Sequence, residues 1–372
     1  MPRLRFALIL LLSSLTVAQT STVPAARLAH IRHGINLSEW FAQVWDPKGY
    51  TPEHFQNWTT ASDIALIKAT GFDHVRLSIN PQPMMDAERK QGGTDQYFNS
   101  LDAAVKMILD AGLAVELDMH PDSDFKVRLK EDEFVQRFAD FWRMVARHYS
   151  SYDPDRVFFE ILNEPEMQDP YRWYGIESKL AAAIRQAAPQ HTIIAAGAKW
   201  DDDDDMITLE PLRDPNVIYV FHFYDPHIFT HQGATWGAYY WRWLKHLHYP
   251  SSPENAAEVA ATVPEAVDRM YVIRYGQDHW DAARIEAEIN QAADWAKKNN
   301  VPLTCNEFGA YRHGADPQDR NAYIRDVRTA LERHNIGWAM WDYSGSFGVV
   351  VKKDGEAVLD PDTVNALGLK TP

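Results

Sequence analysis

Short apolar runs alternate with amphipathic segments along this chain, from about residue 33 to its end. A short continuous apolar run is typical of a strand buried on both faces, whereas apolar residues three to four positions apart indicate a helix. The apolar runs predict eight strands, at residues 33–37, 74–79, 114–119, 157–162, 192–196, 217–221, 302–305 and 336–341.

Segments of helical periodicity lie between most of these strands. One apolar helix face is marked by Phe134, Phe138, Phe141, Trp142, Val145 and Tyr149. Further helices are predicted at residues 61–70, 101–111, 176–187, 285–298 and 320–334, with a short closing helix at 360–369. Gly71 and Gly112 directly follow two of these segments, as expected where a helix ends in a left-handed residue.

Strands that alternate with helices form a parallel sheet. Eight such units without a linker or a break in composition predict an α/β fold, a single (β/α)8 TIM barrel over residues 19–372. A doubly wound open sheet is the alternative. It has little support, because no Gly-x-Gly-x-x-Gly motif follows the first strand.

Two stretches depart from this alternation. Residues 225–280, after the sixth strand, are aromatic-rich and predict the longest irregular segment, an enlarged loop. A long loop in a compact domain is usually functional. The run from Asp201 to Asp205 follows the fifth strand, and a run of like charges predicts a solvated loop.

The fourth strand stops abruptly at Asn163-Glu164-Pro165. Proline cannot donate to the next ladder hydrogen bond and biases its predecessor towards an extended backbone, so Glu164 is expected at the C-terminal end of the strand. In a barrel of parallel strands these ends carry the chemistry. The alternative is a glutamate that faces water at the edge of the sheet.

Similar residue types stand at the ends of other strands. The full set is Arg76, His120, Asn163, Glu164, His222, Tyr224, Glu307 and Trp341. Each has a structural alternative: His120 could be a core histidine, Arg76 a surface ion-pair partner and Trp341 a core residue. Because a barrel places all these ends around one pocket, together they indicate a candidate active site.

Two glutamates in one pocket suggest cleavage of a glycosidic bond. One carboxylic acid protonates the leaving oxygen, while the other carboxylate attacks the anomeric carbon or activates water. Arg76 would hold its partner glutamate ionised. This chemistry requires no cofactor and no metal, and we expect neither.

With these residues in this order, the chain resembles glycoside hydrolase family 5, the cellulase family A group. The strongest element is Ile161-Leu162-Asn163-Glu164-Pro165, which matches the family signature, and the resemblance extends from Gly34 to Trp341. One departure is visible: many members carry a second histidine directly after the one that matches His120, and here that position is Pro121. The departure affects a sugar-contacting loop and leaves the glutamates intact.

The resemblance implies a role for each of these residues. Glu164 would be the acid/base and Glu307 the nucleophile, with carboxyl groups about 5–5.5 Å apart and the pKa of Glu164 raised by burial and negative charge. Arg76 and Tyr224 would contact Glu307. The remaining residues would bind the sugar: Asn163 at its 2-hydroxyl, Trp341 by stacking, and His120 and His222 along the same subsite.

The function implied in this way is a secreted retaining endo-β-1,4-glucanase. An endo-β-mannanase or another β-glucanase of the same family is the alternative, because it would share all these residues. A carbohydrate-binding barrel without catalysis is less consistent with the presence of both Glu164 and Glu307.

The composition limits the classes of molecule that the protein is expected to bind. The chain of 372 residues has a net charge of −15, which argues against nucleic acid and anionic membranes and fits a neutral β-linked polysaccharide or oligosaccharide. Its 13 tryptophans exceed the needs of a core, and some could form flat platforms for sugars. Candidates for stacking or for burial in the barrel wall are Trp40, Trp45, Trp200 and Trp236. We expect a monomer, and a single cysteine, Cys305, excludes an intramolecular disulfide.

The first residues resemble a secretory signal peptide, residues 1–18. Arg3 and Arg5 precede an apolar stretch from Phe6 to Val17, and Thr16-Val17-Ala18 is a small-residue cleavage site. We therefore predict a periplasmic or extracellular protein whose mature N-terminus lies near Gln19. N-terminal sequencing of the exported protein checks this prediction, and a mature protein that retains Met1 would contradict it.

Overall fold

The computed structural model describes residues 21–87, 93–353 and 356–372, so the predicted signal peptide lies outside the described residues. Eight parallel strands close into a barrel in sequence order, β1 to β8, which confirms the predicted fold class. Their bounds are β1 His33–Phe41, β2 His74–Ile79, β3 Ala114–Met119, β4 Val157–Glu160, β5 Thr192–Ala196, β6 Val217–Phe223, β7 Leu303–Phe308 and β8 Gly337–Met340.

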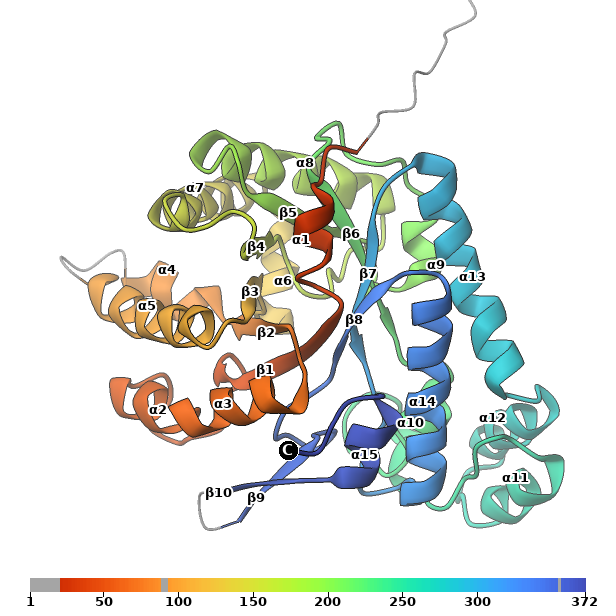
Figure 1. Ribbon diagram of the computed structural model, residues 1–372. Helices are drawn as coiled ribbons and strands as arrows, with labels where there is room; N and C mark the ends of the chain where they lie inside the picture. Colours follow the sequence, from red (N-terminus) through yellow and green to blue (C-terminus); the bar gives the residue numbers. More distant parts are fainter. Residues whose placement is uncertain (1–20, 88–92, 354–355) are drawn as a thin grey trace, which may run out of the picture.

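Long helices surround the barrel (Figure 1). Those that follow its strands and pack on their outer face are α3 Ala61–Thr70, α5 Asp95–Asp110, α7 Asp132–Tyr149, α8 Pro170–Ala187, α13 Ala282–Asn299 and α14 Pro317–Arg333. Shorter helices are α1 Ala25–Leu28, α2 Pro52–Asn57, α4 Pro81–Ala87, α6 Ser123–Val127, η1 Arg128–Lys130, α9 Asp203–Met206 and α15 Pro361–Ala366. The apolar face predicted around Phe134 to Tyr149 is buried on α7.

Several predicted boundaries agree with the structure. Strands β2, β3 and β5 have the predicted bounds, and α3 ends at Gly71, whose backbone is left-handed with φ of 107°. Three strands extend further than predicted, into residues that include polar side chains. β1 continues to Phe41, β6 to Phe223 and β7 to Phe308. The apolar runs did not predict these extensions, because a polar side chain interrupts an apolar run even where it is buried in the barrel.

The interior of the barrel has an apolar part and a polar part. Ile31, Ala114, Phe158, Ile194, Ala196, Ile218 and Val220 form an apolar cluster, separate from the large core between strands and helices. Arg27 of α1 lies near this end of the barrel and binds the carbonyl oxygen of Gln190, 2.5 Å away. Further along the strands the inward side chains become polar, among them Arg76, Glu116 and Glu160, all at most 1% exposed.

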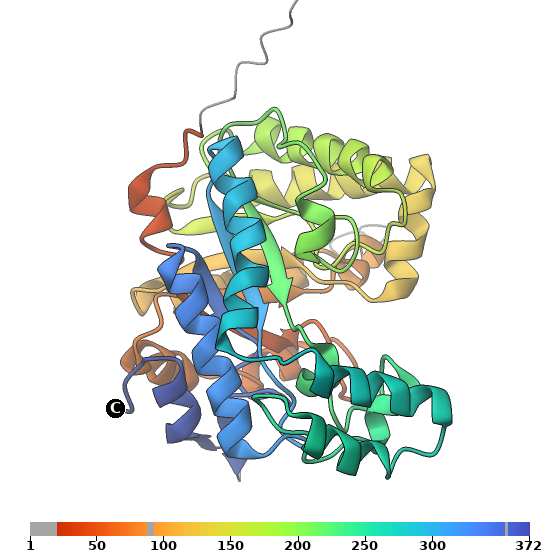
Figure 2. The ribbon, with the colours of Figure 1, turned by 90° about the vertical axis from the view of Figure 1, so that its right-hand side faces the viewer.

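The segment after β6 is folded rather than irregular, which corrects the prediction for residues 225–280. It contains α10 His227–Thr230, η2 Tyr239–Trp243, α11 Pro253–Ala260 and α12 Ala266–Gln277. Figure 2 shows α11 and α12, in teal, projecting from the end of the barrel away from α1. The helical period of α12 is not evident in the sequence, because aromatic residues occur on both of its faces: Tyr271 is exposed and Tyr275 is buried.

A two-stranded antiparallel hairpin was also missed. Strands β9 Val350–Lys353 and β10 Glu356–Leu359 pair after the end of the barrel and lead into α15. Each is only four residues long, too short for a clear alternation to appear in the sequence. Among the described residues, no helix is sufficiently long and apolar to cross a membrane.

Candidate active site

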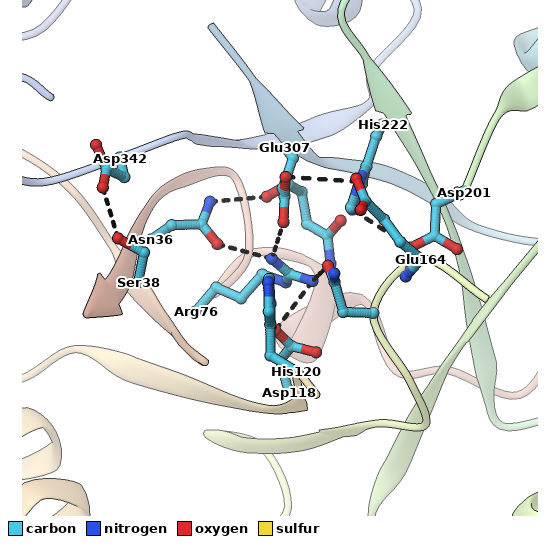
Figure 3. Close-up of polar contacts among 12 residues, drawn as sticks. Asn36, Ser38, Arg76, Asp118, His120, Glu164, Asp201, His222, Glu307 and Asp342 are labelled. Atoms are coloured by element: carbon cyan, nitrogen blue, oxygen red, sulfur yellow. Dashed lines mark hydrogen bonds and ion pairs between the residues drawn. The ribbon is translucent and has the colours of Figure 1, made fainter. Parts of the chain in front are cut away.

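The strand ends converge on one polar site, drawn in Figure 3. At its centre lies the guanidinium group of Arg76 on β2, which has no exposed surface. Its Nη1 donates to Glu307 Oε1 at 2.5 Å, and its Nε and Nη2 each donate to one oxygen of Glu160 at 2.7 Å. Asn36 and Asn163 accept from the same guanidinium at 2.9 and 2.8 Å. The planar group therefore fixes four side chains at once, from β1, from β4 and the residues directly after it, and from β7.

Glu307 on β7 is the more enclosed of the two predicted catalytic residues, with 5% of its side chain exposed. Arg76 binds its Oε1, and the hydroxyl of Tyr224 donates to its Oε2 at 2.9 Å. Burial and the charge of Glu307 raise the pKa of Tyr224 well above its usual value, so the phenol remains a donor. Both oxygens are thus held in place, and negative charge on them is stabilised.

Glu164 follows β4 and is the more accessible carboxyl group, with 29% of its side chain exposed. Its backbone is left-handed, with φ of 46°, and its N–H donates to Asp201 Oδ2 at 2.8 Å. This conformation turns the side chain towards His222, whose Nδ1 lies 3.1 Å from Glu164 Oε1. One carboxylate oxygen of Glu164 and one of Glu307 lie within 4.8 Å of each other.

His222 on β6 stands between these carboxyl groups. Its Nδ1 is 3.1 Å from Glu164 and 3.6 Å from Glu307 Oε2. Burial alone would lower the pKa of His222, but the surrounding carboxylates, Glu307 first, raise it to about 9. The ring therefore carries a positive charge near neutral pH.

The expected rise in the pKa of Glu164 is absent in this structure. Burial does favour its neutral form, but the hydrogen bond and charge of His222 outweigh burial and lower the pKa of Glu164 to about 2. The expectation failed because the sequence did not show that a histidinium would contact this carboxylate. In the free protein the proton shared by the pair resides on His222.

His120 and Trp341 line another side of the site. Their rings are stacked, with centroids 5.5 Å apart and planes at 15°. His120 Nδ1 lies 2.8 Å from Asp118 Oδ2, and burial lowers the pKa of His120 to about 3. The imidazole is therefore neutral, with Nδ1–H donating to Asp118.

The four further tryptophan candidates divide into two groups. Trp40 is 2% exposed and donates from its indole nitrogen to the Phe55 carbonyl oxygen at 2.7 Å. It belongs to the barrel wall, which corrects its candidacy as a sugar platform. Trp45, Trp200 and Trp236 are 76%, 51% and 47% exposed. Trp236 packs edge-on against Tyr311, with centroids 5.0 Å apart.

Several buried polar residues support the site although the sequence pattern did not indicate them. They are Asn36, Glu116, Asp118, Glu160, Asp201 and Asn306. Glu160 was visible as the one charged residue in the apolar run Val157 to Leu162, a signal for an inward-facing functional side chain. Asp201 contradicts the predicted solvated loop: it has no exposed surface, since the backbone after β5 turns it inward beneath Glu164.

Three groups of described side chains have ligand atoms close enough together to hold a metal ion, all within 4.8 Å. The groups are Glu160, Asp201 and His222; Glu164, His222 and Glu307; and His248, Asp316 and Asp319. In the first two, both oxygens of Glu160 and of Glu307 already accept hydrogen bonds from Arg76 or Tyr224. The third joins the segment after β6 to the start of α14 through exposed ion pairs. We assign no metal to any of them.

A closed parallel barrel whose strand ends present two carboxyl groups, one clamped by arginine and tyrosine and one beside histidine, defines the class of (β/α)8 glycoside hydrolases. Comparison with known proteins agrees. Residues 38–346 match the family described as Cellulase (glycosyl hydrolase family 5), and the chain belongs to that family.

Curated relatives extend over most of the chain. It is 28% identical over 348 residues to Endoglucanase C of Acetivibrio thermocellus, covering 91% of this chain and 98% of that protein. It is 26% identical over 373 residues to Endoglucanase 3 of Fibrobacter succinogenes, covering 95% of this chain but only 55% of that relative.

Solved structures show the same fold. Thermotoga maritima Cel5A in complex with cellobiose superposes with a TM-score of 0.73 at 26% identity, covering 92% of this chain and 98% of that one. The same Cel5A has also been solved in complex with mannotriose, again with a TM-score of 0.73 and 26% identity over 92% and 98% of the two chains. The chain is accordingly a glycoside hydrolase.

The charge on His222 predicts a pH-dependent stability. Its pKa is about 9 in the folded protein, above its ordinary value of 6.5, so its contribution is fully present below about pH 6.5 and is lost as the pH rises through about 9. The difference in free energy of unfolding between wild type and His222→Asn should therefore fall over this window, by up to about 3 kcal/mol. Denaturant titrations at a series of pH values measure it.

A matched control is His279→Asn. His279 is an exposed histidine with a left-handed backbone, which asparagine tolerates. Its difference from wild type provides the baseline for replacing a histidine by asparagine. A difference for His222→Asn that does not fall below this baseline trend over the window would contradict the charged state of His222.

Proposed function

We propose that the chain is a secreted retaining endo-β-1,4-glucanase. Secretion is proposed from the N-terminal segment and the β-1,4-glucan substrate from the endoglucanase relatives. The observation that carries the retaining mechanism is the short separation of the two carboxyl groups, whose nearest oxygens lie within 4.8 Å. Inverting enzymes hold their carboxyl groups about 6.5–9.5 Å apart to admit a water, whereas retaining enzymes hold them about 5–5.5 Å apart. The spacing supports direct attack on the sugar by one carboxylate.

In the first step Glu307 is the nucleophile. Its oxygens are aimed by Arg76 and Tyr224, and one of them bonds to the anomeric carbon as the glycosidic C–O bond breaks. Glu164 donates a proton to the leaving oxygen. That proton reaches Glu164 from His222, which is hydrogen-bonded to it at 3.1 Å.

In the second step Glu164 acts as a base. It removes a proton from a water molecule that attacks the anomeric carbon, and Glu307 leaves as a carboxylate. Two displacements on opposite faces of the sugar restore the original anomeric configuration. Arg76 stabilises the negative charge that returns to Glu307.

Sugar binding is assigned to the residues around this pair. Asn163 Oδ1 already accepts from Arg76, which leaves the N–H groups of its amide as donors for the 2-hydroxyl. The stacked Trp341 and His120 form one wall of the subsite. Exposed tryptophans at the loops, including Trp200 and Trp236, supply further stacking surfaces suited to a polymer.

An endo-β-mannanase is the second candidate. It is favoured by the solved complex of Cel5A with mannotriose, a protein with which this chain shares 26% identity. Rates of reducing-sugar release from carboxymethylcellulose, mixed-linkage glucan, xyloglucan and β-mannan decide between the two. The proposal expects the highest kcat/KM on a β-1,4-glucan, and a clear preference for β-mannan would replace it.

The mechanism predicts opposite products from the two catalytic variants. Glu307→Ala should lose turnover, and added azide should restore it with formation of an α-glycosyl azide. Glu164→Ala should lose about 10²–10⁴-fold in kcat/KM on a polymer, yet still react with substrates that have good leaving groups, giving a β-glycosyl azide. NMR of the products identifies the anomers.

NMR of the wild-type reaction provides the direct check of stereochemistry. The first sugar released should have the β configuration at its new reducing end. Release of the α anomer would mean inversion and would contradict the assignment of Glu307 as nucleophile.

The exposed ring of Trp236 predicts a polymer-specific effect. Tyr224, which holds Glu307, contacts Phe347 with centroids 6.0 Å apart, and Phe347 contacts Trp236 at 6.5 Å. Trp236→Ala should therefore raise KM for carboxymethylcellulose about 10-fold, the loss of one stacking contact of about 1.4 kcal/mol, with little change for an aryl cellobioside. Trp243→Ala, in the same segment and 42% exposed, is the control. Equal effects of Trp236→Ala on both substrates would instead indicate a packing role.

A further inference from the structure

Asp201 is joined by its backbone and its side chain to both residues of the acid/base pair. Its carbonyl oxygen accepts the N–H of His222 at 2.8 Å, and its Oδ2 accepts the N–H of Glu164, also at 2.8 Å. The residue has no exposed surface and a left-handed backbone, with φ of 56°. It does not reach the sugar subsite directly, so any effect on the reaction passes through its two neighbours.

The imidazole of His222 lies between two carboxyl groups. Nδ1 faces Glu164 Oε1 at 3.1 Å, and Nε2 faces Asp201 Oδ2 at 3.5 Å (Figure 3). Within the described part of the chain, Nε2 is buried and makes no hydrogen bond, so its polar contact is the ion pair with Asp201 Oδ2. Asp201 Oδ2 is therefore the acceptor available to a proton on Nε2.

Other charges face His222 from the surrounding strands. Glu307 on β7 lies 3.6 Å from Nδ1, and the carboxyl groups of Glu160 on β4 and Asp118 on β3 interact with the ring through their charge. Arg76 on β2 binds all three of these carboxyl groups. These charges favour a protonated ring, but none of them offers Nε2 a hydrogen bond, so they do not decide which nitrogen holds the last proton.

We propose that Asp201 is a positioning residue that keeps the proton of neutral His222 on Nε2, so that Nδ1 can release its proton to Glu164. This inference rests on the proposed function, since it concerns how Glu164 is protonated before it acts as the general acid. The acceptor role of Asp201 does not require a negative charge. Burial raises the pKa of Asp201, and a carboxyl protonated on Oδ1 would still accept through Oδ2.

The proton balance of the step is simple. In the free enzyme the ring carries both protons, with Nδ1–H donating to Glu164 and Nε2–H facing Asp201. The Nδ1–H bond breaks, its electron pair stays on Nδ1, and the proton bonds to Glu164 Oε1. The products are a neutral Nε2–H imidazole and a Glu164 carboxylic acid that then protonates the leaving oxygen.

Without an acceptor at Nε2 the other tautomer becomes favourable. A neutral ring protonated on Nδ1 would still donate to Glu164 and hold it as a carboxylate, which cannot act as an acid. The first displacement would then be slower, and the loss of rate would be larger for a leaving group that must be protonated to depart. A leaving group that departs readily as an anion would be affected little.

The test compares two substitutions of Asp201 on two substrates. Asp201→Leu has a similar shape but removes the acceptor, whereas Asp201→Asn keeps an amide oxygen that the N–H of Glu164 orients towards the ring. For Asp201→Leu, kcat/KM on carboxymethylcellulose should fall about 10- to 100-fold, the range seen for outer hydrogen-bond partners of metal-ligating histidines, and by less than about threefold on 2,4-dinitrophenyl β-cellobioside. kcat/KM is used because it reports the first displacement.

For Asp201→Asn both values should stay within about threefold of wild type. Asp204→Asn, an exposed residue of the same acidic run, is the control for surface charge. Equal losses on both substrates in Asp201→Leu would mean a general structural role and would overturn the proposal. So would an Asp201→Asn variant as impaired as Asp201→Leu, because the acceptor oxygen is then not what matters.

A second measurement keeps Asp201, in case Asp201→Leu does not fold, and removes the carboxylate that competes for the Nδ1 proton. In histidine-labelled Glu164→Ala protein, ¹⁵N chemical shifts from pH 5 to 10 show which ring nitrogen of His222 loses its proton, with the signal assigned by its loss when His222 is also replaced by asparagine. Deprotonation at Nδ1 is expected, and deprotonation at Nε2 would overturn the proposal. If the wild type hydrolysed no β-glycan, the proposed function would fail, whereas the tautomer of His222 would still be measured.

Discussion

The active site depends on the burial of one cation. Arg76 has no exposed surface, and an unpaired buried guanidinium would cost several kcal/mol. Its fork of N–H groups is satisfied by Glu160, Glu307, Asn36 and Asn163, which come from both halves of the barrel. The barrel must therefore close in its correct register before the cation is stable. The same contacts that satisfy Arg76 orient Glu307, the proposed nucleophile.

Buried acids outnumber buried cations around this site, so some must hold protons. Burial and the neighbouring Glu160 raise the pKa of Glu116, which favours a proton on this acid. His222 provides a second positive charge on the side of Glu164. Each cation lies beside one of the two proposed catalytic residues: Arg76 stabilises negative charge on Glu307, and His222 carries a proton next to Glu164.

The interior of the barrel has an apolar part, which stabilises the fold, and a polar part, which holds the candidate active site. An apolar cluster that includes Phe158 and Ile218 fills one part of the interior, while polar side chains fill the part from which the loops extend. The helical segment after β6 adds exposed aromatic rings beside this polar part, linked to Tyr224 through Phe347. A buried wall that fixes two carboxyl groups and an exposed aromatic rim suit the proposed action on a polysaccharide.

The sequence by itself determined the eight-strand barrel and the residues at its strand ends, because apolar periodicity and a strand-terminating Asn-Glu-Pro are local signals. Only the tertiary structure decided burial and protonation, since these depend on residues distant in the chain. Trp40 proved to be a wall residue, and Asp201 proved to be buried under Glu164. The pKa of Glu164 likewise follows from His222, 58 residues away in sequence and 3.1 Å away in space.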